Sequence, residues 1–303
     1  MLGSIRQIIG GRRQSAVTPV PTPQPEGSHV ARAIARYRAG RREPFSDGYT
    51  EYKEDLLRQI LEDPAAMARF RDGAALPAGF GARLDERIVE YPWVLARLPQ
   101  GDGLVVDAGS TFNKAALLAT PQLRQRRILV YTLETDWITY DPRLSYIFGD
   151  LRQMLLRDAC AEALVCISTL EHVGFTYEYT TYSRRNPWPH AQPRSYLDAV
   201  REFRRVLRPG GRLLLTVPYG AYEDHGWLQQ FDAPMIAAVK EAFGGATVAE
   251  TYYRYRDGGW ARADAAECAG LSYFNIHETG GRFEEDGLAA ARAVACLELE
   301  RAA

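Results

Sequence analysis

The sequence is poor in cysteine and has no long apolar run. It contains four cysteines in 303 residues, and no two of them form a C-x-x-C pair. That spacing argues against a zinc site, and we expect reduced, buried thiols such as Cys166 and Cys296, which lie in apolar runs. No run of 18 apolar residues occurs, which predicts no membrane span. The N-terminal segment lacks the apolar centre of a signal peptide, so we expect a cytoplasmic protein.

An excess of either charge is also missing. The net charge is −1 and the isoelectric point is about 6.5. A protein of this balance has no general field that would attract nucleic acid, so we expect no nucleic-acid partner. The oligomeric state stays open.

The chain divides into three parts by composition. Residues 1–28 end in a proline-rich linker and predict a disordered tail. Residues 29–100 contain helical patterns at 29–40, 50–70 and 84–98, the last bent or started at Pro92, and predict a helical extension. Residues 101–303 form the third part, which carries the strand-like runs.

Five apolar runs in this third part predict buried parallel strands. They are residues 104–110 (LVVDAGS), 127–134 (RILVYTLE), 144–150 (LSYIFGD), 164–168 (LVCIS) and 211–218 (GRLLLTVP). Alternating patterns at 246–255 and 293–300 predict two antiparallel strands that close the sheet. The fold class is therefore α/β, with a Rossmann-like, mostly parallel sheet. Ligands of such sheets lie outside the carboxyl ends of the strands, here marked by Gly109, Glu134 and Asp150, which indicates a nucleoside-like ligand.

Several of these segments together resemble class I S-adenosylmethionine-dependent methyltransferases. The segments are DAGS after the first strand, an acid ending the second, GD ending the third, ISTLEHVG after the fourth, and EFRRVLRPGGRLLLTVP around the fifth. The resemblance extends from about residue 89 to the C-terminus. Within the family, this region is similar to a bacterial subgroup with a methyltransferase type 11-like domain. It implies a seven-stranded sheet with an antiparallel last strand, and S-adenosylmethionine as cofactor over strands one to four.

The resemblance also implies roles for residues at the cofactor. Gly109 would let the backbone approach the methionine part, and Asp107 would orient that turn or receive the ligand's ammonium group. Glu134 would accept hydrogen bonds from the ribose hydroxyls, and Asp150 from the adenine amino group, with Leu151 packing on the ring. Ordinary alternatives stay open: Gly109 as a tight turn, Glu134 as a solvated strand end, and Asp150 as the cap of a helix.

The methyl-transfer side would be formed by residues 168–172, beginning at Ser168. His172 is the best general-base candidate, because imidazole can take an acceptor proton near neutral pH. Asp224 or His225, in the loop after the fifth strand, could serve instead, and Glu171 could be a structural acid paired with an arginine. An aromatic and arginine-rich insert at 175–196 would cover the acceptor or form a mobile lid.

The sequence departs from the family pattern in the loop after the first strand. The loop reads Asp107-Ala-Gly-Ser-Thr-Phe-Asn and has one glycine, so Phe112 would crowd a cofactor unless it turns away. Residues 161–163 also replace the usual pair of a phenylalanine and an aspartate. We expect a methyltransferase acting on a small molecule or glycan, with oxygen as acceptor atom. The alternatives are a non-catalytic binding or scaffold protein and an NAD(P)-dependent oxidoreductase, which this loop disfavours because it lacks G-x-G-x-x-G.

Overall fold

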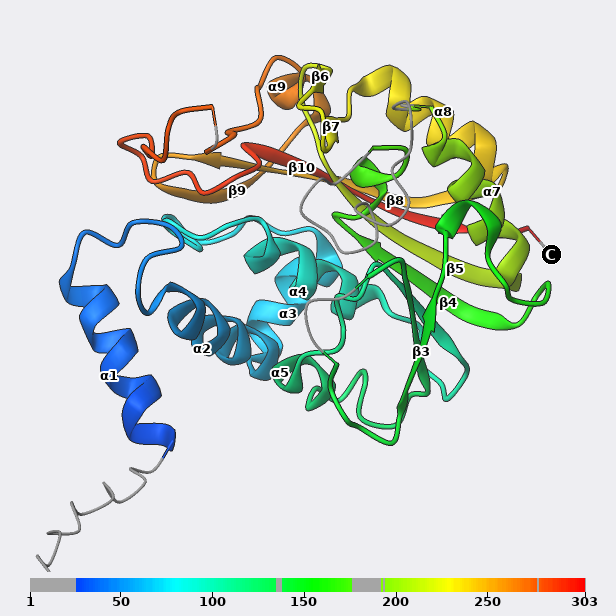
Figure 1. Cartoon of the computed structure of the whole chain (residues 1–303), viewed down its shortest axis with the longest axis horizontal. Helices are drawn as coiled ribbons and strands as arrows, with labels where there is room; N and C mark the ends of the chain where they lie inside the picture. The colour runs from blue at the N-terminus through cyan, green and yellow to red at the C-terminus, as the bar shows by residue number, and fades with distance from the viewer. Residues whose placement is uncertain (1–25, 135–137, 176–191, 193, 277, 303) are drawn as a thin grey trace, which may run out of the picture.

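The computed structural model describes residues 26–134, 138–175, 192, 194–276 and 278–302 (Figure 1). The predicted tail at 1–28 lies almost wholly outside them. Most of the aromatic insert, including the tyrosines and arginines expected to meet an acceptor, also lies outside them. Within the described residues, no helix combines the length and the apolar character that crossing a membrane requires.

The N-terminal extension is helical, as predicted. Its helices are α1 (Glu26–Ala39), α2 (Tyr49–Glu62), α3 (Pro64–Asp72) and α4 (Arg87–Arg97). The helix expected over 50–70 is in fact two helices. The break falls at Asp63, whose side chain accepts a hydrogen bond from the backbone N–H of Ala65, while Pro64 occupies the first turn of α3. Pro92 lies inside α4 and does not start it.

Eight of the ten strands in the described residues form one large mixed sheet. In the order in which they pair, they are β3 (Leu144–Phe148), β2 (Ile128–Thr132), β1 (Val105–Ala108), β4 (Ala161–Ile167), β5 (Leu207–Pro218), β10 (Ala293–Glu300), β8 (Ala246–Arg256) and β9 (Gly259–Ala263). The first five are parallel, and β10 runs antiparallel between β5 and β8. The predicted α/β class and the antiparallel last strand are confirmed.

The expected count of seven strands is wrong, because β9 adds an edge strand. It pairs with β8 through a two-residue turn at Asp257 and Gly258, both with positive φ. Asp-Gly is the dipeptide that this kind of hairpin turn favours, so the sequence did carry the signal.

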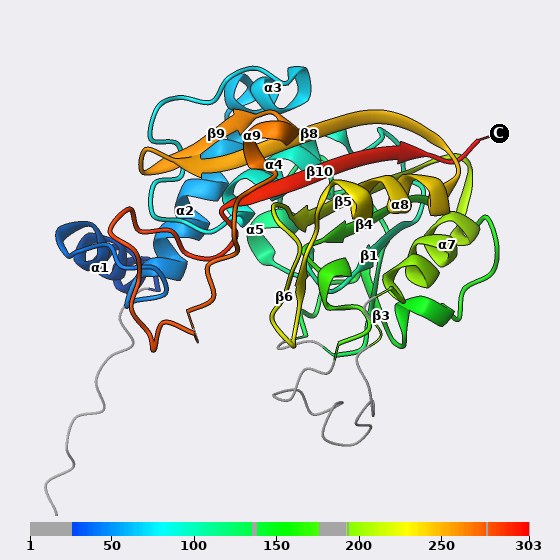
Figure 2. The ribbon, with the colours of Figure 1, turned by 90° about the horizontal axis from the view of Figure 1, so that it is seen from above.

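Helices cover both faces of the sheet (Figures 1 and 2). One face packs against α4 and the other N-terminal helices, together with the short helix α5 (Ala115–Leu118). The opposite face packs against α7 (Tyr196–Val206) and α8 (Ala233–Phe243). Every residue of β1 and β2 is buried, which is why these strands read as continuous apolar runs. The edge strand β3 is half-exposed.

Candidate functional site

The carboxyl ends of β1, β2 and β3 are joined by backbone hydrogen bonds. The N–H of Gly109 donates to the carbonyl of Tyr131 at 3.0 Å, and the N–H of Gly149 donates to the carbonyl of Thr132 at 2.9 Å. The hydroxyl of Thr132 donates to the backbone carbonyl of Glu134 at 2.7 Å. Gly109, Glu134 and the residue before Asp150 therefore follow one another along a single edge of the sheet.

Asp107 orients the turn after β1, which is the first of the two roles considered for it. Its carboxylate accepts hydrogen bonds from the backbone N–H groups of Thr111, at 2.8 Å, and Phe112, at 2.7 Å, and from the Thr111 hydroxyl at 2.7 Å. The side chain is completely buried, and this burial raises the pKa of Asp107 to about 6. The carboxylate is thus already satisfied by its own loop.

Gly109 is needed at this turn because β4 comes close to it. Its φ is +122°, and a Cβ atom built there would lie 2.0 Å from Oγ1 of Thr169, just beyond β4. Phe112 is fully buried in the core cluster between the sheet and the N-terminal helices. The expected crowding therefore does not arise from Phe112, since its ring turns into that core.

Asp150 caps the short 3-10 helix η1 (Leu151–Gln153). This is one of the two roles that the sequence analysis left open for this residue. It accepts from the backbone N–H of Arg152 at 2.9 Å and pairs with its guanidinium at 2.7 Å. Leu151 is buried in the core on the α7 side of the sheet. Asp150 and Arg152 line a hollow of about 420 Å³ together with Asp198 and Glu202 of α7.

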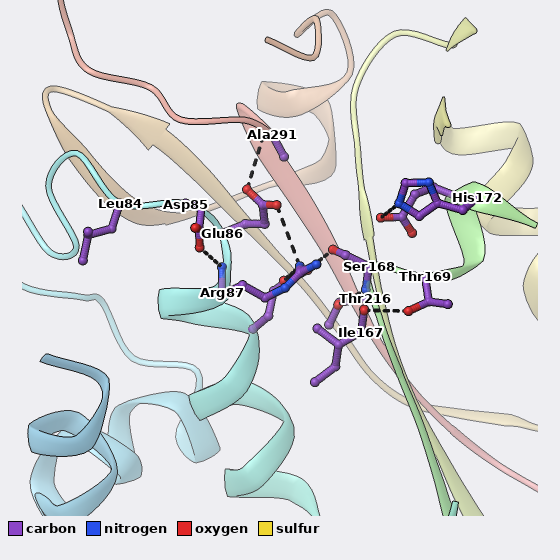
Figure 3. Close-up of polar contacts among 12 residues, drawn as sticks. Leu84, Asp85, Glu86, Arg87, Ile167, Ser168, Thr169, His172, Thr216 and Ala291 are labelled. Carbon is purple, nitrogen blue, oxygen red and sulfur yellow. Dashed lines mark hydrogen bonds and ion pairs between the residues drawn. The ribbon is translucent and has the colours of Figure 1, made fainter. Parts of the chain in front are cut away.

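The tip of β4 is held by a residue of the N-terminal extension. Ser168 has a φ of +37°, a strained conformation for a side-chain-bearing residue. Its hydroxyl donates to Oε1 of Glu90 at 2.7 Å, and its backbone N–H donates to the carbonyl of Thr216 at 3.0 Å (Figure 3). Glu90 is completely buried and also forms an ion pair with Arg87. Helix α4 therefore reaches the edge where the sequence placed the ligand.

The sequence reasoning missed Glu90 and its neighbours, although one signal was available. Residues 88–95 of α4 are all buried, and Glu90 is the charged residue among them. A charged side chain inside an otherwise apolar helix segment is rarely buried without a specific partner. The pattern could have indicated a buried polar contact, but not that the contact is with Ser168.

His172 lies in the 3-10 helix η2 (Leu170–His172) next to a buried acid. Its Nδ1 lies 2.9 Å from the carbonyl oxygen of Trp227, which makes Nδ1 the protonated nitrogen and leaves Nε2 as the acceptor nitrogen. Nε2 is 4.0 Å from Oε1 of Glu171. Burial lowers the pKa of His172 to about 4, so the ring is neutral at pH 7, and burial raises the pKa of Glu171 well above its usual value.

The two other base candidates lie on the short hairpin of β6 (Glu223–Asp224) and β7 (Gln229–Gln230). Asp224 is exposed and accepts a hydrogen bond from the N–H of Gly226, as in an ordinary turn. His225 lies between two acids, with Nδ1 at 3.0 Å from Glu278 and Nε2 at 3.4 Å from Glu223. Of the three candidates, His172 is the one placed beside the buried Glu171.

The sequence matches no protein-family model and no curated protein. Its fold resembles solved structures at low identity. A geranyl diphosphate methyltransferase in complex with S-adenosylmethionine is 12% identical, with a TM-score of 0.44 over 80% of this chain and 94% of that one. The 1,6-didemethyltoxoflavin-N1-methyltransferase of Burkholderia thailandensis is 14% identical, with a TM-score of 0.40 over 96% and 99%. The [4+2]-cyclase SpnF is 14% identical, with a TM-score of 0.44 over 80% and 93%.

These similarities are too distant to assign an activity. The last strand β10 is antiparallel to its neighbours β5 and β8, and an antiparallel last strand is what the resemblance in the sequence implied. The chain has a Rossmann-like α/β fold.

Proposed function

We propose that this protein is an S-adenosylmethionine-dependent methyltransferase that acts on a small molecule or glycan, with oxygen as the acceptor atom. The observation that carries the proposal is the pair of hydrogen bonds from Gly109 to Tyr131 and from Gly149 to Thr132. They join the ends of three strands, so the glycine and the two acids expected at an adenosyl group lie on one edge. Parallel sheets bind nucleoside-like ligands at this edge.

The groups at this edge fit the cofactor. The carboxylate of Glu134 can accept hydrogen bonds from two ribose hydroxyls. The side chain of Asp150 is 24% exposed, so its carboxylate can accept a hydrogen bond from an amino group while it pairs with Arg152. The loop at Gly109 has no second and third glycine for a pyrophosphate, a group that S-adenosylmethionine lacks. When bound, the cofactor supplies an electrophilic methyl group.

The chain's own residues would position the acceptor and receive its proton. Methyl transfer is an in-line displacement, so holding the two partners in contact contributes much of the acceleration. Neutral His172, oriented by the carbonyl of Trp227, presents Nε2 to a hydroxyl proton. Glu90 fixes Ser168 and thereby the backbone that leads into η2.

One observation favours the alternative of a non-catalytic relative. The carboxylate of Asp150 is already bound by the backbone and side chain of Arg152, and that of Asp107 by its own loop. A protein that had lost its cofactor would retain such internally satisfied acids.

Calorimetric titration with S-adenosylmethionine and S-adenosylhomocysteine tests the proposal. We expect both to bind, and we expect Glu134→Ala to weaken binding at least tenfold, about 1.4 kcal/mol, through loss of the ribose hydrogen bonds. Glu241→Ala, an exposed acid on α8, is the matched control and should leave affinity unchanged. Binding of NADH in place of S-adenosylmethionine and S-adenosylhomocysteine would favour the oxidoreductase. If none of the three ligands binds, the result would favour the scaffold protein.

A further inference from the structure

Glu171 is a buried acid whose carboxyl group is incompletely satisfied. Glu171 is 3% exposed, and its Oε2 atom has no hydrogen-bond partner in the part of the chain that the structure describes. Its other oxygen is 4.0 Å from Nε2 of His172. A buried polar atom without a partner costs free energy, so such an atom in a folded protein needs an explanation. A ligand that donates to Oε2 would provide one.

Two further buried acids lie near Glu171 and share one cation with it. Glu90 is completely buried and Glu86 is 8% exposed. Arg87 forms an ion pair with Glu90 and has a nitrogen 3.8 Å from Oε1 of Glu86. Figure 3 shows Glu86 directed toward Ala291 and Arg87 toward Ser168, at the tip of β4. If all three acids were ionised, the group would carry two more negative charges than positive ones.

The charges that act on Glu171 explain why this excess matters. Burial is the largest effect, and repulsion by Glu90 and Glu86 adds to it. Together they outweigh the attraction of Arg87 and keep the pKa of Glu171 well above its usual value. Burial likewise raises the pKa of Glu86 to about 7. Both acids therefore take up protons where other carboxyls stay ionised. A bound cation would stabilise their ionised forms.

Aromatic rings lie next to this group. The ring of His172 is 5.3 Å from that of Trp227, and the ring of Trp227 is 6.3 Å from that of Tyr273. Burial, reinforced by the charges of Glu86 and Glu171, raises the pKa of Tyr273, so this phenol lies in the field of both acids. Aromatic faces beside a carboxylate are suited to an organic ammonium group.

We propose that Glu171 binds the protonated amino group of the acceptor, which makes the substrate an amine-bearing small molecule or an amino sugar. This inference rests on the proposed methyltransferase function and names its substrate class. The ammonium serves for binding and is distinct from the hydroxyl that receives the methyl group. A metal ion is a poorer occupant, because the described residues contain no group of three or more side chains able to hold one.

The test is calorimetric titration of the full chain with 2-phenylethylamine and with its uncharged counterpart 2-phenylethanol. We expect the amine to bind at least tenfold more tightly than the alcohol. Glu171→Gln, which keeps the shape and removes the charge, should abolish the difference, whereas Glu241→Gln should preserve it. Glu86→Gln should reduce the preference, and it decides the question if the first variant does not fold. Equal binding of the two probes, absence of binding by either, or a preference that survives both substitutions would overturn the proposal.

Adding S-adenosylhomocysteine separates this proposal from the proposed function. We expect the amine and S-adenosylhomocysteine to bind together. Competition between them would assign Glu171 to the cofactor's own ammonium group and overturn the acceptor assignment. Binding of S-adenosylhomocysteine without any amine preference would overturn only this inference, whereas failure of S-adenosylhomocysteine to bind would overturn the function on which it rests.

Discussion

Gly109→Ala is the substitution whose consequence the structure defines most directly. The added Cβ would lie 2.0 Å from Oγ1, 2.6 Å from Cγ2 and 2.7 Å from Cβ of Thr169. Rotation of the Thr169 side chain could relieve the first two contacts but not the third, because Cβ does not move with χ1. The backbone at the tip of β4 would have to shift away from the end of β1.

The cost has two parts that can be separated. A non-glycine residue at a φ of +122° costs about 1–3 kcal/mol, and overpacking costs a further ~1–3 kcal/mol. For a domain of this size, each kcal/mol lowers the melting temperature by about 2–4 °C, so we expect a fall of about 4–24 °C. Gly210→Ala is the matched control. Its φ is +70° and nothing lies within 4 Å of the added Cβ, so only the backbone part applies.

Differential scanning calorimetry of three variants measures both parts. Gly109→Ala should melt well below Gly210→Ala. The double variant Gly109→Ala/Thr169→Gly should recover part of the difference, since it removes the three Thr169 atoms nearest to the added Cβ. We also expect Gly109→Ala to weaken S-adenosylmethionine binding, because the shifted backbone adjoins that edge. Equal melting temperatures for the two single variants, or no recovery in the double variant, would refute the reasoning.

Three further predictions concern the acids and the histidine near the tip of β4. Glu90→Gln keeps a hydrogen-bond acceptor for Ser168 but removes the ion pair with Arg87, whose side chain is 25% exposed. We expect the free energy of unfolding, measured by urea denaturation, to fall by about 2 kcal/mol. An unchanged midpoint of the urea transition would contradict this. The pKa of His172 is about 4 in the folded protein and ~6.5 when unfolded, so stability should decrease as the pH falls from about 6.5 to 4. His172→Gln should flatten that decrease in melting temperature; an identical pH profile would show that His172 does not contribute. His172→Ala should slow methyl transfer more than it weakens cofactor binding, and equal turnover would move the base role to Asp224 or His225 or remove it.

Much of the fold could be predicted because its signals are local. The buried strands β1 and β2 read as apolar runs, since both faces of the sheet are covered. The order of acids and glycines after successive strands predicted a shared edge, and the hydrogen bonds of Gly109 and Gly149 confirm that the strand ends meet. The capping role of Asp150, left open beside a ligand role, could be decided only with the position of Arg152 in view.

The errors have physical reasons of their own. The strand β9 was missed because five residues with little alternation give a weak pattern, although the Asp-Gly turn before it was visible. The helix over 50–70 was predicted as one because its apolar periodicity continues past Asp63. The roles of Glu134, His172 and the other site residues remain predictions.

The sequence alone determined the buried parallel strands and most of the helices, because each depends on residues a few positions apart. Only the tertiary structure decided that Glu90 reaches Ser168, 78 residues along the chain, and that Thr169 approaches Gly109. It also decided that Glu171 is buried beside three charged residues of another segment. Such contacts depend on how helix α4 packs across the sheet, and local periodicity carries no information about that packing.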